Sequence, residues 1–367
     1  MSMMSVLVTG GAGYVGSHTA VMLLEAGYDV VIVDNLSNSN IDVIARIEHI
    51  TKGSVTFYHK DLCDADALNA IFANHHFHAV LHFAGHKSVA ESVTHPLAYY
   101  HNNVTGSIHL LTCIEQYAVP HLIFSSSATV YGANACPPYT EDMPLGEPTS
   151  PYGATKQTIE KLISAQCLRK TDTTLSLPKL CAVSLRYFNP IGAHPSGELG
   201  ELASEQPNNL LPIVLNVAVE RQAELAIYGE HYPTPDGTCR RDYVHVMDVA
   251  AGHVKALAYL QRKTERKNPI DTNKNDSEQE YGAEHVVFNL GTGTPLSVLE
   301  IVRQAEQIIN KSIPFKFYPA RVGDLSEFWA DTHKALNSLD WRAEYDITQM
   351  IKHAWSWHTS QYLTSHS

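Results

Sequence analysis

The sequence predicts an α/β protein, in which a Rossmann-type doubly wound parallel sheet is followed by a smaller C-terminal α+β lobe. Up to about residue 189, short apolar runs alternate with helix-like segments, as in parallel sheets whose strands are joined by crossover helices. Beyond that point Pro, Gly and Asn become frequent, and helix-like runs alternate with short strands. We therefore expect a first domain over 1–189, with some strand and helix exchanged with the C-terminal half, and a smaller lobe over 190–367.

The strands expected in the first domain are short apolar runs, as buried parallel strands are. They cover residues 6–9, 29–34, 55–58, 79–83, 121–125 and 182–185. Helices are expected from the first turn to residue 27 and over 65–73, 96–117 and 151–168. Pro96 and Pro151 each suit the first turn of a helix, and Ser150 is a good N-cap residue.

In the C-terminal half, helix-like and strand-like segments are also distinguishable. Helices are expected over 210–221, 246–260 and 297–310, and strands over 225–228, 286–290 and 315–318. Residues 263–284 are almost wholly polar and charged. Such a segment cannot bury a core, which indicates a mobile surface insertion.

The first strand and the turn after it carry the clearest signal of a ligand. Gly10, Gly13 and Gly16 follow the strand at three-residue spacing, and a helix begins at the same turn. Glycines allow a tight turn and the close approach of a pyrophosphate, which the helix N-terminus then binds. Asp34 ends the next strand, where a carboxylate can bind a ribose 2′-hydroxyl. Because Asn35 follows it, and no arginine does, the sequence favours NAD over NADP.

Charge and composition exclude several kinds of partner. The formal net charge is −12, so we expect no nucleic acid as a partner. No apolar run reaches the length of a membrane span, and no signal-peptide pattern is present, so we expect no membrane partner either. The six cysteines form no C-x-x-C pair, which indicates reduced thiols and a cytoplasmic protein.

Tyr152 and Lys156 form a Tyr-x-x-x-Lys pair on the helix that begins at Pro151, and residues four apart share one helix face. A lysine charge about 4 Å from a phenol, at an effective dielectric of ~20, could supply up to ~4 kcal/mol, or roughly three pKa units. That shift would make the phenol an efficient general base near neutral pH. The alternative is a Tyr–Lys pair at the surface.

Ser127 lies in the run Ser-Ser-Ser-Ala-Thr-Val-Tyr-Gly over 125–132, just past an expected strand. A hydroxyl at that strand end can hold a substrate oxygen and share its proton with Tyr152. The alternative is that these hydroxyl side chains only cap the loop.

Further stretches are specific enough to indicate a family. They are Asp-Asn-Leu over 34–36, His-Phe-Ala-Gly-His-Lys over 82–87, Arg-Tyr-Phe-Asn-Pro over 186–190, Gly-Ala-His-Pro-Ser-Gly over 192–197, Pro-Asn-Asn-Leu over 207–210 and Arg-Asp-Tyr-Val-His-Val over 241–246. With the glycine turn, Ser127 and the Tyr–Lys pair, they closely resemble the UDP-glucose 4-epimerases of the extended short-chain dehydrogenase/reductase superfamily. The resemblance implies an isomerase that interconverts UDP-glucose and UDP-galactose through a transient 4-keto sugar, with tightly bound NAD.

The resemblance also implies a role for individual residues. The catalytic residues would be Ser127, Tyr152 and Lys156. NAD would contact these three and Gly10, Gly13, Tyr14, Val15, Gly16, Asp34, Asn35, Asn38, Asp61, Leu62, Phe83, Ala84, Gly85, Lys87, Asn102 and Phe188. The UDP-sugar would contact Lys87, Ser127, Tyr152, Asn189, Asn208, Asn209, Leu210, Tyr228, Arg241, Arg321, Asp324 and Phe328. The first domain would then bind NAD, the lobe would bind the UDP-sugar, and a homodimer would form through the helices at 96–117 and 151–168.

Alternatives to this function remain open. The chain could be a 4-epimerase for another UDP-sugar. A nucleotide-sugar 4,6-dehydratase would need acid/base carboxylates beside Ser127, but Ala128 and Thr129 follow it, and no acid precedes Tyr131. An NAD-sensing regulator without turnover would have no need for the three catalytic residues together.

Two further features concern specificity and metals. The resemblance places Phe328 where relatives carry tyrosine or a small residue, so its bulk predicts that N-acetylated UDP-hexoses are excluded; core packing is an equally good reason for an aromatic residue there. His75, His76 and His78 form a cluster, but no cysteine or carboxylate set completes it, so we expect no metal. We expect His245 to be structural.

Overall fold

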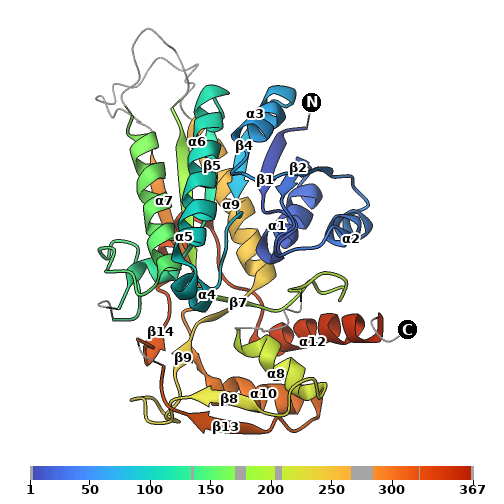
Figure 1. Ribbon diagram of the computed structural model, residues 1–367, viewed down its shortest axis with the longest axis vertical. Coiled ribbons are helices and arrows are strands. Elements are labelled where there is room, and N and C mark those ends of the chain that lie inside the picture. The colour runs from blue at the N-terminus through green and yellow to red at the C-terminus, as the bar shows by residue number, and fades with distance from the viewer. Residues whose placement is uncertain are drawn as a thin grey trace.

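Figure 1 shows the computed structural model of the chain, which describes residues 3–133, 136–169, 179–202, 209–265, 284–321 and 323–364. Its centre is a seven-stranded sheet in which every pair of neighbours is parallel. The strands in chain order are β1 (Ser5–Thr9), β2 (Asp29–Asp34), β3 (Thr56–His59), β4 (Ala79–His82), β5 (His121–Ser127), β6 (Cys181–Tyr187) and β11 (His285–Leu290). The doubly wound α/β fold predicted from the sequence is confirmed.

The strand order across the sheet is β11-β6-β5-β4-β1-β2-β3. The direction of winding therefore reverses between β1 and β4. In open parallel sheets a crevice forms at such a reversal, beyond the carboxyl ends of the strands, and ligands bind there. The order alone thus places the candidate site at the carboxyl ends of β1, β4 and β5.

Helices cover both faces of this sheet (Figure 1). One face carries α3 (Ala65–Asn74), α6 (Gly106–Gln116) and α7 (Pro151–Cys167), which bury their apolar sides against the sheet. The other face carries α1 (Tyr14–Glu25), α2 (Asp42–Thr51), α9 (Val246–Glu265) and α11 (His333–Leu339). The central strands β1, β2, β4, β5 and β6 are buried between the two layers, which explains their near-continuous apolar runs. The edge strand β3 is partly exposed.

The single helix expected over 96–117 is instead three segments, α5 (Pro96–Tyr99), a π-helical turn (Tyr100–Thr105) and α6, preceded by α4 (Val89–Thr94). The π-turn contains the buried Asn103, whose Oδ1 accepts the His86 N–H at 2.8 Å and whose Nδ2 donates to Thr155 Oγ1 at 3.1 Å. A wide turn of this kind is frequent at functional sites. Here it joins the loop after β4 to the start of α7.

The C-terminal lobe lies beyond the carboxyl end of the sheet, at the bottom of Figure 1. Its core is formed by α8 (Leu210–Ala218), α10 (Val298–Ile309), α12 (Ile347–Thr364) and the parallel pair β8 (Leu225–Tyr228) and β13 (Phe315–Tyr318). Smaller sheets are β7 (Asn189–Ile191) with β10 (Tyr243–His245), and β9 (Arg240–Arg241) with β12 (Leu296–Ser297) and β14 (Glu327–Phe328).

Two segments from the second half of the chain lie in the sheet layers. β11, expected in the lobe, pairs with β6 at the edge of the large sheet, and α9 packs against α1. The chain therefore crosses between the sheet layers and the lobe more than once. Most of the insertion expected over 263–284 lies outside the described residues, and its first residues, Lys263 and Thr264, belong to α9. In the part of the chain that the structure describes, no helix has the length and apolar character needed to cross a membrane.

Candidate active site

The glycine turn lies between β1 and α1, at the carboxyl end of the sheet. Gly10 has a φ of +69°, a left-handed conformation that favours glycine, and a Cβ atom there would lie 2.6 Å from the backbone nitrogen of Ala84. At Gly13 a Cβ would contact only the carbonyl oxygen of Gly10, at 3.2 Å. The turn is therefore closed toward the loop after β4 and open beside the start of α1, where helical N–H groups lack an acceptor within the helix. This shape fits the pyrophosphate of a dinucleotide.

Asp34 fixes the turn to the loop that follows β2. Its buried carboxylate accepts the Ala12 N–H at 3.0 Å through Oδ2, and the Leu36 N–H and Ser39 hydroxyl, both at 2.9 Å, through Oδ1. A carboxylate has about four lone pairs, so one remains for a further donor such as a ribose hydroxyl. A 2′-phosphate at this point would be repelled, and the geometry therefore fits NAD better than NADP.

The loops after β2 and β3 meet at the same edge. Asn35 Nδ2 donates to Asp61 Oδ2 at 2.8 Å, which joins the two loops. Leu62 is buried beneath them, and Asn38 is exposed in the loop after β2. These four residues, expected to contact NAD, are thus gathered beside Asp34.

The loop after β4 faces the glycine turn and also reaches the lobe. Lys87 Nζ forms an ion pair with Glu201 Oε1 at 2.7 Å and lies 5.6 Å from the centroid of the Tyr14 ring. The Tyr14 hydroxyl donates to the carbonyl oxygen of Gly192 at 2.7 Å. Asn102, in the π-turn, donates through Nδ2 to Asn103 Oδ1 at 2.9 Å. Lys87 and Tyr14, both expected to contact NAD, therefore also connect the sheet layers to the lobe.

Ser127, Tyr152 and Lys156 come together at the carboxyl end of β5. Ser127 is the last residue of that strand. Ser150 caps α7 as predicted, because its Oγ accepts the Gly153 N–H at 3.2 Å, and this places Tyr152 in the first turn beside Ser127. Lys156 Nζ lies 5.8 Å from the centroid of the Tyr152 ring.

The electrostatics of this group differ from the prediction. Burial raises the pKa of Tyr152, and its interaction with Ser127 only partly opposes that rise. Lys156 Nζ donates to the Ser125 carbonyl at 2.8 Å and not to the phenol, and burial lowers the pKa of Lys156 to about 8 while the charge of Glu160 opposes the shift. The prediction that the pKa of Tyr152 falls toward neutral is wrong for this structure, because burial of the phenol raises its pKa.

Cationic side chains expected at the UDP-sugar lie in the lobe. Arg241 Nη2 pairs with Asp324 Oδ1 at 2.7 Å, and the Arg321 guanidinium lies 3.9 Å from the centroid of the Tyr228 ring. Guanidinium groups bind phosphate oxygens in a planar fork and stack on aromatic faces. The set therefore has the chemistry to hold a nucleoside diphosphate.

An aromatic cluster lies beside Arg241, which pairs with Phe328 between β9 and β14. The centroid of the Phe328 ring lies 5.0 Å from that of Phe188 and 4.9 Å from that of Tyr139. The three rings belong to one small apolar cluster. Phe328 therefore packs against its neighbours at the position where the sugar pocket is expected. Its contacts are compatible with both explanations for its bulk, the exclusion of N-acetylated UDP-hexoses and core packing.

The remaining residues expected at the substrate lie where the chain enters the lobe. Asn189 begins β7 and pairs with Tyr243 of β10. Asn209 Nδ2 donates to Glu201 Oε1 at 3.3 Å, and Leu210 begins α8. Asn208 lies outside the described residues.

The structure adds residues that the sequence analysis did not select. Tyr187 lies beside Ser127 in the pairing of β6 with β5, and its hydroxyl is hydrogen-bonded to Ser125 Oγ. Burial raises the pKa of Tyr187, and the nearby Tyr152 adds to the rise. The signal available in the sequence was its place at the end of an apolar strand, but which strand it joins could only come from the sheet order.

The histidines contribute to packing in the described residues. His75 Nε2 is 2.9 Å from the Tyr58 hydroxyl, and its ring stacks on Phe77. His245 Nδ1 accepts the Met247 N–H, and its Nε2 lies 3.0 Å from His353 Nδ1. Across the ranges that the structure describes, no group of three His, Cys, Asp or Glu side chains is placed to hold a metal ion.

Known proteins resemble this chain over almost its whole length. Residues 7–354 match the family model described as GDP-mannose 4,6 dehydratase. The UDP-glucose 4-epimerase of Bacillus subtilis is 45% identical over 357 residues, 97% of each chain. A UDP-glucose 4-epimerase structure from Stenotrophomonas maltophila with NAD and formylated UDP-arabinopyranose superimposes with a TM-score of 0.88 at 40% identity, covering 98% of this chain and 99% of that one. One from Bifidobacterium longum with NAD+ and UDP gives 0.85 at 40% identity, covering 98% and 99%.

Proposed function

This chain belongs to the UDP-glucose 4-epimerase family, and on that basis we propose that it interconverts UDP-glucose and UDP-galactose by inverting C4 through a transient 4-keto sugar. The observation that carries the proposal is the meeting of Ser127, Tyr152 and Lys156 at the carboxyl end of β5, beside the glycine turn. A phenol, a hydroxyl and an ammonium at this point can move a proton to and from a sugar alcohol.

NAD is the cofactor of this family, and the site fits it. The open side of the turn at Gly13, the N-terminus of α1 and the buried Asp34 match a pyrophosphate and a ribose diol. When bound, NAD would supply a hydride acceptor for the sugar C4–H bond and, in its reduced form, a hydride donor for the opposite face of C4. Residues proposed to hold NAD are Gly10, Gly13, Tyr14, Val15, Gly16, Asp34, Asn35, Asn38, Asp61, Leu62, Phe83, Ala84, Gly85, Lys87, Asn102, Ser127, Tyr152, Lys156 and Phe188.

Tyr152 acts as the base in this proposal. Its phenolic oxygen takes the proton of the sugar 4-hydroxyl and gives it back when the opposite configuration forms. Ser127 shares a hydrogen bond with the same oxygen, and the buried positive charge of Lys156 favours the phenolate. Because burial raises the pKa of Tyr152, the phenol needs positive charge close by to ionise, and Lys156 contributes it electrostatically without contacting the oxygen.

The lobe over 190–367 would hold the UDP portion, and 1–189 would form most of the NAD-binding domain. The two guanidinium groups of Arg241 and Arg321 would meet the diphosphate, with Tyr228 and Asp324 holding them in place. Asn189, Asn208, Asn209, Leu210 and Phe328 complete the proposed substrate set. Anchoring through UDP leaves the sugar free to present either face of C4.

The family model that matches is described as a dehydratase family, so the dehydratase alternative needs a direct test. Elimination of water requires a proton carrier beside Ser127, whereas Ala128 and Thr129 occupy those positions. Incubation with UDP-galactose separates the outcomes: UDP-glucose for an epimerase, a dehydrated keto sugar for a dehydratase, and no change for a sensor. Denaturing the purified protein should also release NAD that was never added.

We also propose a homodimer formed through α5, α6 and α7. These helices lie side by side with α4 and leave apolar side chains exposed, with Val93 of α4 at 62%, Leu97 at 82%, Ile108 at 44% and Leu168, just after α7, at 74%. Leu97→Glu with Ile108→Glu should convert a dimer into a monomer in sedimentation velocity, because the charges would be buried in the interface. Leu336→Glu, at a leucine of α11 that is 44% exposed as Ile108 is, serves as the control.

A cytoplasmic location is part of the same proposal. The six cysteines all lie in described residues and none of them forms a disulfide, as is usual for proteins of a reducing compartment.

A further inference from the structure

A buried cluster of charges lies directly behind the catalytic residues. Glu160, on α7, accepts from Arg186 of β6 through both oxygens, with Nε to Oε1 at 2.9 Å and Nη2 to Oε2 at 2.6 Å. Ser126 Oγ donates to Oε1 at 2.5 Å. The Glu160 and Arg186 side chains are each 4% exposed. A bidentate pair of this kind is the strongest form of the interaction, and at this depth water does not screen it.

The cluster is connected to each catalytic position through the chain. Glu160 follows Lys156 by one turn on the same face of α7. Ser126 and Arg186 are paired across β5 and β6, and each directly precedes a residue of the site, Ser127 and Tyr187. One carboxylate therefore ties together the helix and both strands that carry the catalytic groups.

We propose that Glu160 is a positioning residue that keeps the Lys156 ammonium charged and in place beside Tyr152 during turnover. The inference rests on the proposed function, because it assigns Glu160 a task in that reaction. Two buried cations, Lys156 and Arg186, share one buried anion, so a phenolate at Tyr152 would make the group neutral. Glu160 thus stabilises Lys156 in its protonated form, which Tyr152 requires to act as a base. Removal of the Glu160 charge would leave the two cations, Lys156 and Arg186, without a buried anion.

Other ionisable groups near this cluster do not change charge around neutral pH. Burial lowers the pKa of His82 to about 3 and also lowers that of His285. Burial raises the pKa of Tyr131 to about 12 and that of Tyr187 further. His82 lies on β4, His285 on β11, Tyr131 in the turn after β5, and Tyr187 on β6. Loss of activity on the alkaline side should therefore report Lys156, whose pKa is lowered to about 8.

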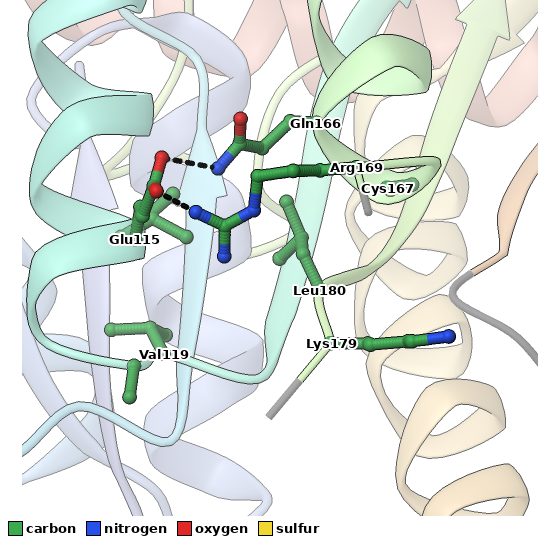
Figure 2. A pocket seen from close by; sticks show the side chains of 9 residues that line it. Glu115, Val119, Gln166, Cys167, Arg169, Lys179 and Leu180 are labelled. Carbon is green, nitrogen blue, oxygen red and sulfur yellow. Dashed lines mark hydrogen bonds and ion pairs between the residues drawn. The ribbon is translucent and has the colours of Figure 1, made fainter. Parts of the chain in front are cut away.

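Figure 2 shows a pair of the same residue types that serves as a control. Glu115 of α6 pairs with Arg169 and accepts from Gln166 Nε2 at 2.8 Å. These residues lie at the opposite end of α7, and Glu115 and Arg169 are 40% and 33% exposed. Glu115→Gln thus removes a paired carboxylate without touching the site.

The test is the pH profile of kcat for UDP-galactose epimerisation by the holoenzyme. The alkaline limb is the fall of kcat at high pH. In Glu160→Gln it should move to lower pH by about one unit, because the carboxylate that opposes deprotonation of Lys156 is gone. Glu115→Gln and Ser126→Ala, which leave the Glu160 charge in place, should keep the limb of the unaltered protein. A folded Glu160→Gln protein with an unshifted limb would overturn the proposal.

If Glu160→Gln does not fold, Glu160→Gln with Arg186→Met removes both charges and leaves no unpaired ion of that pair. The double variant should shift the limb in the same direction but by less, because loss of the Arg186 cation partly offsets loss of the Glu160 anion. An unshifted limb there also contradicts the proposal. Failure of the proposed function is distinguishable, because the unaltered protein would then form no UDP-glucose or would be insensitive to Tyr152→Phe.

Discussion

Near the two ends of the central sheet, α7 is flanked by the same kind of Glu–Arg pair in opposite surroundings. At the carboxyl end of the sheet, Glu160 and Arg186 are almost fully buried and adjoin Ser127, Tyr152 and Lys156. At the amino end, Glu115 and Arg169 are partly exposed (Figure 2), and none of the proposed site residues lies there. Burial, and not the residue pair itself, decides what each pair can do.

The physical reason is the dielectric. An exposed pair is solvated and screened, so it contributes little to stability or to the field at a distance. The electrostatic field of a buried pair is not screened by water, but burying the two charges costs desolvation free energy. Removal of one partner then destabilises the protein, because the other charge stays buried and unpaired. The sequence motifs and the reversal of the strand order both favour the carboxyl end of the sheet for the proposed reaction. The buried Glu160–Arg186 pair lies at the same end, so its charges act together with that of Lys156.

The largest expected difference between the two ends is catalytic. Tyr152→Phe should reduce kcat by about 10²–10⁴-fold, because the variant lacks the proton acceptor. Tyr117→Phe, at the amino end, removes a hydroxyl that lies 3.0 Å from Asn69 Oδ1 and should leave kcat unchanged. Comparable losses in both variants would show that the ends do not differ as described.

Stability should separate the two ion pairs next. Arg186→Met leaves Glu160 buried and unpaired, which should lower the free energy of unfolding by about 3–5 kcal/mol. Arg169→Met should lower it by at most about 1 kcal/mol. Urea unfolding at pH 7 measures both, and an equal effect would contradict the role assigned to burial.

Acid sensitivity should also be concentrated at the carboxyl end. His82 bridges Thr9 Oγ1 at 2.7 Å and Ser107 Oγ at 2.9 Å, and burial lowers its pKa from 6.5 to about 3. Between pH 6.5 and 3 the unfolded chain binds a proton there that the folded chain does not, so the free energy of unfolding falls as the pH falls. His82→Gln should weaken this dependence between pH 7 and 5.

The exposed His76, before the amino end of β4, provides the control for that experiment. His76→Gln should leave the pH dependence of the urea midpoint as it is in the unaltered protein. The same slope in all three proteins would remove His82 as a source of acid sensitivity.

A smaller effect is expected where the site meets the lobe. Phe328→Ala removes the ring that packs against Phe188 and Tyr139 and should raise kcat/KM for UDP-N-acetylglucosamine by about tenfold or more, in the range of pocket-size effects. Unchanged discrimination, or equal turnover of this sugar by the unaltered protein, would favour core packing as the reason for the phenylalanine.

Much of this architecture follows from local patterns. The first βαβ unit is predicted by a strand, a glycine turn, a helix and then Asp34 at the end of the next strand. The start of α7 is predicted by Ser150 and Pro151. Both predictions succeed because turns and helix caps depend on neighbouring residues. The π-turn around Asn103 and the place of β11 beside β6 depend on contacts between distant segments, so no local pattern reports them. Asn208 lies outside the described residues, and its role stays a prediction.

The electrostatics were the least predictable part. Spacing put Lys156 on the same helix face as Tyr152, but burial of the phenol raises its pKa, and burial cannot be read from the spacing. In the sequence, nothing distinguishes Glu160 from the other polar residues of the helix. Only the packing of β6 against α7 shows that Glu160 is paired with Arg186. Charge balance in a core is a property of the assembled layers.

In the proposed reaction, C4 is oxidised and reduced within one site, and its hydrogen does not exchange with water. The sharpest test is turnover of UDP-[4-²H]glucose, followed by mass spectrometry and NMR of the UDP-galactose formed. The product should keep its deuterium at C4. Replacement of that deuterium by hydrogen from water would rule out the proposed reaction.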